Sequence, residues 1–367
     1  MANVTLKSDR VRVPDSFETI NRLYYARGWS DGLPIIPPTE ERVEEMLAYT
    51  DRAPDEVIAQ VPPKRGDATV EKVAINCVMA GCMPQYLPLV ITSLEAMCEP
   101  QFNLYGCQAT THVVAPLVIV NGPVREELDI NWGYNAFGQG WRSNATIGRA
   151  LRLILMNVGG GVPGVLDRAT FGHPGKYSYC VAENEEANPW EPLHVELGFP
   201  KEVSTVTVIG AEAPHNINDH GSTSAEEVLL TCAGTMATPG CNNAYLEGQY
   251  VLSLGPEHAS TVAGDGWSKD DIKNYLYEHV RVPVRYFSAG NLKRFYKIRS
   301  KYFHPGQNQD EMIPIARNKD EFIIVVIGGA GKHSAAIPTF GETRAVTKPI
   351  AFKDGTPVQS VEDYVKK

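Results

Sequence analysis

Residues 320–332 read DEFIIVVIGGAGK, and this stretch decides the fold class. Its apolar run, residues 322–327, is bounded by two acids on one side and by glycines on the other. A run of this length with β-branched residues is typical of a strand buried on both faces. Such strands occur where helices cover both sides of a sheet, so the stretch predicts an α/β protein.

Four other stretches repeat the pattern. Strands are predicted in VVAPLVIVNGP (113–123), KYSYCVAE (176–183), STVTVIGAE (204–212) and YVLSLG (250–255). Helical stretches lie between most of them, including SAEEVLLTCAGTMA (224–237) and SKDDIKNYLYEHV (268–280). Alternation of buried strands with helices predicts a mixed or mostly parallel sheet layered with helices, with a polar cleft at the C-terminal ends of the strands.

The length of 367 residues suggests about two domains. We predict an N-terminal α/β half over residues 1–185 and a C-terminal half over residues 186–367. The Pro-rich, acidic stretch AENEEANPWEPLHVELGFPKEVS (182–204) is the candidate boundary. The same stretch is equally consistent with a loop inside one large domain.

Bulk composition excludes several classes of protein. The net charge of −9, from 43 acids and 34 bases, argues against non-specific binding to nucleic acid or to an anionic membrane. No apolar segment is long enough to span a bilayer, and the first residues lack the apolar core of a signal peptide. Seven scattered cysteines do not form a disulfide framework. We therefore expect a cytoplasmic protein with reduced thiols.

The glycines after residue 327 resemble a phosphate-binding loop, and counting positions tests this idea. A Walker loop has the pattern G-x-x-x-x-G-K-[ST]. Counted from Gly331 and Lys332, the first glycine would have to be Val326 and the hydroxyl residue would have to be His333. Both positions fail, which excludes a nucleotide triphosphatase.

A weaker anion site remains consistent with this stretch. Backbone N–H groups of Gly329–Gly331 at a helix start can bind a carboxylate or phosphate. Lys332, Ser334 and Arg142 are the further candidates for substrate binding. The alternative is a tight turn in which the glycines serve only the backbone.

The stretch APHNINDHGS (213–222) is the densest polar segment. In a loop, His215, Asp219 and His220 can converge on a divalent transition metal. The pattern is not specific, because no H-E-x-x-H motif supports it. The alternative is local turn hydrogen bonding by Asn and Asp.

The candidate catalytic residues come from several segments. Cys82 lies at a helix break before Pro84, where a helix N-terminus can lower a thiol pKa and supply a nucleophile or ligand. His112 and His333 are candidates for proton transfer, and Glu183 for a general base. For Cys82 the alternative is a buried packing thiol.

Several phrases together resemble one bacterial family: DGLPIIPPTEERVEEML, EKVAINCVMAGCMPQYLPLVI, QATTHVVAPLVIVNGP, NATIGRALRLILMNVGG, GHPGKYSYCVAENEE, PHNINDHGS and GGAGKHS. The chain is similar to poorly characterised proteins found with, or fused to, a domain carrying a U-G-S-C selenocysteine or cysteine motif. The resemblance covers residues 28–350 and implies an enzyme system. This chain has no UGSC or CGSC string, so if that motif carries a redox step, this protein either lacks the step or borrows it from a partner. Cys82 lies inside a matching phrase, whereas Cys77 and Cys107 look less typical of the family's phrases, and the resemblance therefore favours Cys82.

The leading hypothesis is an enzyme that acts on a small anionic or polar organic substrate, with Cys82 as thiolate and histidines as acid and base. One alternative is a metal-dependent lyase or hydrolase built on His215, Asp219 and His220. Another is a non-catalytic subunit that partners a UGSC-type protein. We also expect a homo-oligomer and no nucleic-acid or membrane partner.

Overall fold

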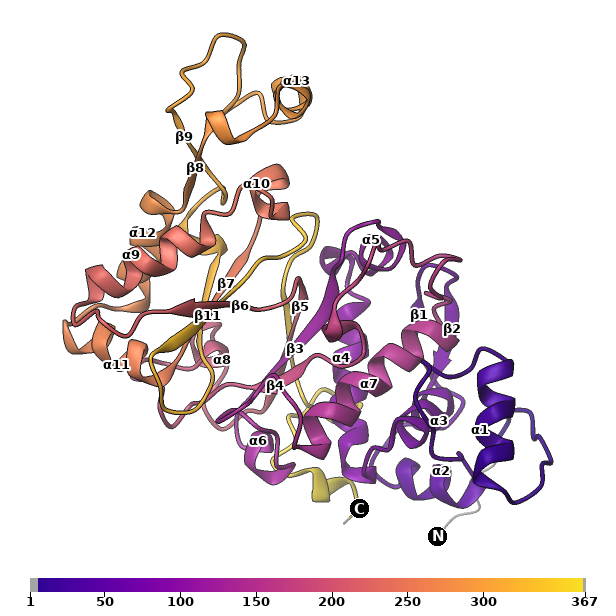
Figure 1. The fold of residues 1–367 in the computed structure, drawn as a ribbon. Coiled ribbons are helices and arrows are strands. Elements are labelled where there is room, and N and C mark those ends of the chain that lie inside the picture. Colours follow the sequence, from indigo (N-terminus) through magenta and orange to yellow (C-terminus); the bar gives the residue numbers. More distant parts are fainter. Residues whose placement is uncertain (1–5, 366–367) are drawn as a thin grey trace. The chain divides into compact units, whose positions relative to one another are not determined.

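A computed structural model describes residues 6–365 and shows a mixed α/β fold (Figure 1), which confirms the predicted fold class. The chain forms two compact units. Within the described residues, unit 1 comprises 6–183, 194–210 and 345–365, and unit 2 comprises 184–193 and 211–344. The units are therefore not two consecutive halves, because two later segments return to unit 1. No helix in the described part of the chain combines the length and apolar character needed to cross a membrane.

Unit 1 contains a four-stranded mixed sheet with the order β12-β5-β3-β4. Its strands are β3 (Ala115–Asn121), β4 (Cys180–Ala182), β5 (Thr205–Ala211) and β12 (Val346–Pro349). β3 and β4 run parallel, whereas β12 and β5 run antiparallel. Every residue of β5 is buried, as predicted from its continuous apolar run.

Helices provide most of the remaining core of unit 1. The main ones are α3 (Val70–Ala80), α4 (Leu87–Met97) and α7 (Arg142–Asn157), and α3 packs on α7. The other elements in this part of the chain are α1 (Phe17–Ala26), α2 (Glu40–Leu47), β1 (Val57–Val61), β2 (Gly66–Thr69), α5 (Leu104–Ala109), α6 (Val124–Glu127) and α8 (Leu193–Glu196). Short 3₁₀ turns at Pro84–Tyr86, Pro100–Phe102, Pro174–Lys176 and Val361–Tyr364 complete them.

Unit 2 contains a second four-stranded sheet with the order β10-β7-β11-β6. Its strands are β6 (His215–Asn218), β7 (Tyr250–Leu254), β10 (Phe322–Val326) and β11 (His333–Ile337). β10 is parallel to β7, and β11 lies antiparallel between β7 and β6. The glycine stretch after β10 therefore leads into a strand, and the expected helix start at this position is wrong. As a strand, residues 333–337 pair with β6 on one side and with β7 on the other, and a helix at this position could not make these hydrogen bonds.

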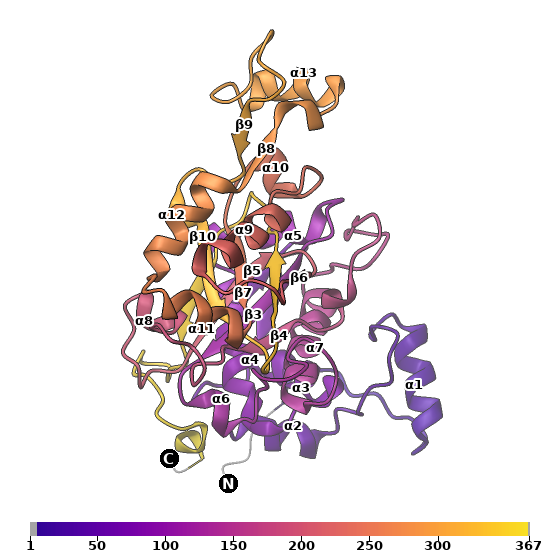
Figure 2. The ribbon, with the colours of Figure 1, turned by 60° about the vertical axis from the view of Figure 1, so that its left-hand side comes forward.

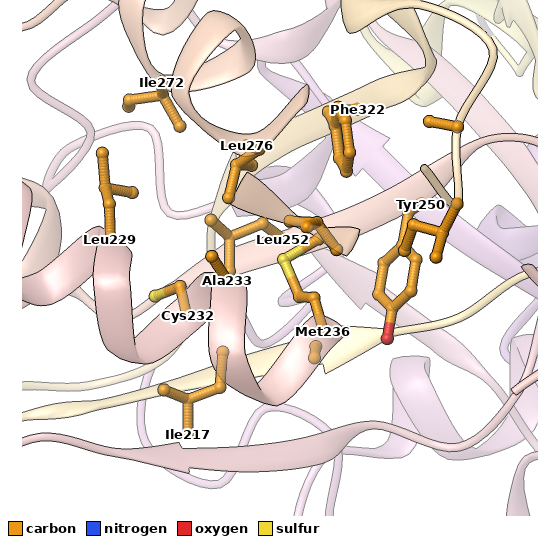
Figure 3. Packing of buried hydrophobic residues seen from close by; sticks show 14 of the residues in the cluster. Ile217, Leu229, Cys232, Ala233, Met236, Tyr250, Leu252, Ile272, Leu276 and Phe322 are labelled. Atoms are coloured by element: carbon orange, nitrogen blue, oxygen red, sulfur yellow. The ribbon is translucent and has the colours of Figure 1, made fainter. Parts of the chain in front are cut away.

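Helices α9 (Ala225–Met236), α10 (Asn242–Leu246), α11 (Pro256–Gly264) and α12 (Lys269–His279) belong to unit 2. Figure 3 shows their apolar side chains meeting those of the sheet, with Met236 from α9, Leu276 from α12 and Leu252 from β7. Each of these three side chains is fully buried. Burial of one such side chain contributes about 1.5–3 kcal/mol, so this interface stabilises the strand framework that carries the polar loops.

A smaller lobe extends from unit 2 and spans residues 281–314. It contains β8 (Arg281–Pro283), paired antiparallel with β9 (Met312–Pro314), and α13 (Ala289–Ile298). Phe295 makes an edge-to-face contact with Phe287 and a tilted contact with Phe303, with ring centroids 5.4 Å and 4.9 Å away. Figures 1 and 2 show that the lobe projects beyond the end of the β7–β10 sheet. Its aromatic cluster gives the projection an ordered core.

Candidate functional site

Two histidines from different segments face each other in unit 2. His333 begins β11, and its Cα partner in β6 is Asn218, so their side chains lie on the same face of the sheet. His220 follows β6, and its Nε2 lies 3.3 Å from Nε2 of His333. The ring centroids are 5.1 Å apart and the ring planes make an angle of 81°. We call His220 and His333 the imidazole pair; both residues are exposed.

Asn216 fixes the orientation of one ring. Its Oδ1 lies 2.9 Å from Nδ1 of His333. An amide oxygen only accepts, so Nδ1 of His333 carries the proton and Nε2 presents a lone pair when the ring is neutral. A base oriented by a third group is the arrangement used in acid–base catalysis. Asn216 was part of the polar stretch in the sequence, but its role depends on the register between β6 and β11.

The carboxylate of Asp219 is hydrogen-bonded by donors of the loop that carries it and of α9. One carboxylate oxygen accepts the backbone N–H groups of Gly221 and Ser222, and the other accepts the hydroxyls of Ser222 and Thr231. Burial raises the pKa of Asp219, but the hydrogen bonds outweigh it and lower this pKa to about 2. Asp219 is thus an ionised anchor for the loop between β6 and α9.

The expected metal set is not assembled. Among residues 6–365, no group of three or more His, Cys, Asp or Glu side chains is placed to hold a metal ion. Asp219 uses both oxygens within its loop, and His215 pairs with Ala336, three residues along β11 from His333. His220 meets His333 instead. The geometry therefore does not support a metal site made of His215, Asp219 and His220, because the Asp219 carboxylate already accepts four hydrogen bonds from its own loop and α9.

The anchoring role of Asp219 has a pH signature. We expect Asp219→Asn to lower the free energy of unfolding by about 1–2 kcal/mol at pH 7, because two hydroxyl donors lose their charged acceptor. The folded pKa lies below the ordinary value of 3.8, so the stabilisation is complete above about pH 5 and declines as pH falls towards 2. Urea unfolding of both proteins at pH 7 and pH 3 measures the difference. Asp320→Asn, at an exposed carboxylate, is the control; a difference that does not shrink at pH 3 contradicts the anchor.

Lys332 and the glycines form the turn before β11. Nζ of Lys332 lies 3.3 Å from the carbonyl of His220 and 3.4 Å from that of Ser222. Gly328 and Gly331 have φ values of 117° and 146°, which only glycine adopts without strain. The backbone conformation of the turn therefore explains why Gly328 and Gly331 are glycines, and Lys332 contacts the loop after β6. Anion binding by Gly329, Gly331 and Lys332 stays a prediction.

Ser334 belongs to an internal hydrogen-bond chain. Nε2 of His258 lies 2.9 Å from the carbonyl of Asp219, so Nε2 donates and Nδ1 is free to accept. The Ser334 hydroxyl donates to that Nδ1 over 2.7 Å and accepts the N–H of Gly255 over 3.1 Å. Only 7% of Ser334 and 1% of His258 is exposed. This hydrogen-bond network links β11, α11 and the loop after β6, and substrate binding by Ser334 stays a prediction.

Cys82 ends a helix in unit 1. Gly81 has φ 91°, and two backbone bonds close the end of α3, from Gly81 to Val78 and from Cys82 to Cys77. This is the Schellman motif, in which the first residue after the glycine packs on the residue five positions earlier. The thiols of Cys77 and Cys82 are accordingly in contact, and burial and this contact raise the pKa of Cys77. Cys82 is 7% exposed and its Sγ donates to the carbonyl of Thr146 over 3.3 Å.

These contacts are those of a packing thiol. A nucleophilic cysteine needs access and a stabilised thiolate. Burial within unit 1 denies Cys82 this access, so its catalytic role stays a prediction without support from this unit. Arg142 donates from Nε to the carbonyl of Gly81 over 2.9 Å and so ties the start of α7 to the same helix end. Substrate binding by Arg142 likewise stays a prediction.

His112 and Glu183 lie in unit 1 near β3. Nδ1 of His112 accepts the backbone N–H of Val114 over 3.2 Å, which orients the ring against its own turn. Glu183 is fully buried and accepts from Nδ2 of Asn121 over 2.7 Å. The catalytic roles predicted for His112 and Glu183 stay predictions, as does the polar cleft.

One charged group in unit 1 was not predicted. Lys176 forms an ion pair with Asp167 over 2.6 Å, and its carbonyl accepts from Nε of Arg152 over 2.8 Å. Burial lowers the pKa of Arg152 and also that of Lys176. The group holds two cations and one carboxylate, a positive excess that favours an anionic ligand. Arg152 lies in an apolar stretch of α7, and nothing in the neighbouring sequence predicts its contact with Lys176.

No family model matches the chain, and no curated protein matches it.

Proposed function

We propose that this protein is an enzyme that acts on a small anionic or polar organic molecule, with the imidazole pair as its acid–base centre. The observation that carries the proposal is the exposed lone pair on Nε2 of His333, oriented by Asn216 and facing His220.

The arrangement suits proton transfer. Nε2 of His333 can accept a proton from a substrate O–H or C–H bond while Nδ1 keeps its hydrogen bond to Asn216. The resulting imidazolium keeps its Nδ1–H on the Asn216 oxygen. Its new Nε2–H can pass to Nε2 of His220, 3.3 Å away, when the neutral His220 ring carries its own proton on Nδ1. Histidine serves this role because its ordinary pKa lies near 6.5.

The test is turnover. The full-length protein is incubated with a panel of small carboxylates, hydroxy acids and amides, and consumption is followed by proton NMR. Loss of turnover in His333→Ala supports the proposal. Turnover that is unaffected by this change refutes the acid–base assignment. A protein that turns over nothing alone and co-purifies with a UGSC-type partner supports the non-catalytic subunit instead.

A second candidate is a metal-dependent lyase or hydrolase, and one distance favours it. Two nitrogens that bind one tetrahedral ion at about 2.0–2.1 Å lie about 3.3–3.4 Å apart. The Nε2 atoms of the imidazole pair are 3.3 Å apart. Histidine ligands also commonly donate their other ring N–H to an oxygen, as His333 does to Asn216. Water and a substrate carboxylate would complete the coordination.

Metal binding separates the two candidates. If the pair is a metal site, Zn²⁺ or Co²⁺ is expected to bind with 1:1 stoichiometry in calorimetric titration, and His220→Ala or His333→Ala is expected to weaken binding at least about 10-fold. His279→Ala is the matched control, because this exposed ring stacks on Tyr275 in α12. Binding that neither pair variant weakens contradicts the metal candidate. Metal-independent turnover that requires His333 supports the acid–base assignment.

A further inference from the structure

The lobe carries a charge opposite to that of the rest of the chain. Residues 281–309 contain no Asp or Glu and seven basic residues, Arg281, Arg285, Lys293, Arg294, Lys297, Arg299 and Lys301. The whole chain has a net charge of −9, so the remainder carries −9 − 7 = −16. A basic segment of this density within an acidic chain is a local electrostatic feature that the total charge conceals.

The cations gather on one face of α13. Lys293 and Arg294 lie four and three positions before Lys297, and all three are exposed, whereas Phe295 is fully buried in the aromatic cluster. None of these three cations forms a salt bridge within the residues that the structure describes. By contrast, Arg299 is buried and donates to the carbonyls of Ala244 and Pro314, so it serves the lobe itself. The exposed face of α13 is therefore an unneutralised basic surface.

Apolar side chains lie exposed in the same lobe. Tyr286 is 60% exposed, Ile298 is 50% exposed and Met312 is 47% exposed. Arg285 lies over the ring of Tyr286 at 5.3 Å from its centroid. Aromatic residues, Met and Arg are enriched in the cores of protein interfaces. The lobe thus offers both steering charge and apolar surface to a protein partner.

We propose that the lobe, residues 281–314, docks on the acidic surface of a second copy of this chain. A second copy brings the required negative charge, because Asp310 and Glu311 reduce the charge of the lobe to +5 and the chain outside residues 281–314 therefore carries −9 − 5 = −14. In a two-fold symmetric pair each lobe meets the acidic part of the other copy, so both basic surfaces are neutralised and the assembly closes.

Mass measurement by light scattering after size exclusion tests this, using the full chain at 50 mM and 500 mM NaCl. The expected result is a dimer or larger closed oligomer at low salt, with weaker association at high salt because screening shortens the range of the charges. Lys293→Glu/Arg294→Glu/Lys297→Glu is expected to raise the dissociation constant at least about 10-fold. The neutral Gln triple variant is expected to have a smaller effect in the same direction.

The control reverses three exposed cations outside the lobe, Arg12→Glu/Arg22→Glu/Lys201→Glu. It is expected to remain associated, because these residues lie in unit 1 and outside the proposed surface. Thermal melts by circular dichroism show whether each variant is folded; if the Glu variant is not, the Gln variant decides. A monomeric wild type, or equal dissociation of lobe and control variants, overturns the proposal. So does lobe-dependent binding to DNA or to phosphatidylserine vesicles by a protein that does not self-associate.

Discussion

His333→Ala is expected to lower kcat/KM for the chain's substrate by about 10²–10⁴-fold, the usual contribution of a positioned acid or base. The structure gives this residue an exposed Nε2 lone pair, a fixed tautomer and a second imidazole within 3.3 Å. Alanine removes all three and leaves a strand residue at a position that tolerates small side chains, since β11 already contains Ala335 and Ala336. Steady-state kinetics on the compound found in the screen measures the loss.

Two further variants show whether the loss is chemical. Asn216→Ala should leave some activity and shift the pH profile, because it frees Nδ1 of His333 without removing the base. His279→Ala should leave the rate unchanged, because its ring lies on α12 and stacks on Tyr275. An equal loss in His279→Ala and His333→Ala would mean that histidine replacement merely unfolds unit 2.

Gly255→Ala is expected to lower the free energy of unfolding by about 3 kcal/mol, a large effect for one methyl group. A Cβ at this position would lie 2.0 Å from the carbonyl oxygen of His333 and 3.4 Å from that of Gly331. Both obstacles are backbone atoms, and β11 is held on both sides by β6 and β7, so neither can give way cheaply. The N–H of Gly255 also donates to Ser334. Urea denaturation followed by circular dichroism measures the change.

Gly264→Ala is the matched control for that experiment. This glycine ends α11, nine residues further on, and no heavy atom lies within 4 Å of a Cβ built there. Alanine is favoured over glycine in helices by up to about 1 kcal/mol, so the control should be neutral or slightly stabilising. A cost below about 0.5 kcal/mol for Gly255→Ala would show that β11 is free to move, and would undermine the fixed geometry of the imidazole pair.

Much of the fold was predictable from local composition. β3, β5, β7 and β10 are continuous apolar runs buried in sheets, and each was expected from that pattern. β11 was not, because HSAAI has helix-forming alanines and follows glycines that suit a helix start. Pairing with β6 and β7 outweighs this local preference, and such long-range pairing leaves no mark on a single segment.

The candidate site likewise depends on long-range contacts that the local sequence does not reveal. The sequence identified His220 and His333 as separate candidates, one for metal and one for protons. Their contact joins residues 113 positions apart (333 − 220) and arises from the antiparallel register of β6 and β11. Asp219 was misjudged as a ligand candidate because short Asp side chains serve turns and metals equally well in sequence, and only its four donors distinguish the two uses.

The order of the strands in unit 2 also constrains how the chain folds. β6 and β7 both precede the strand that joins them, because β11 follows Asn218 by 115 residues (333 − 218). Until it arrives, both strands keep an unpaired edge, which is the feature that promotes association between partly folded chains. In unit 1, the β5 edge likewise waits for β12, at Val346–Pro349. Since both sheets close only with the last part of the chain, folding should be slow and dependent on the completed C-terminal segment, and shortened chains should aggregate.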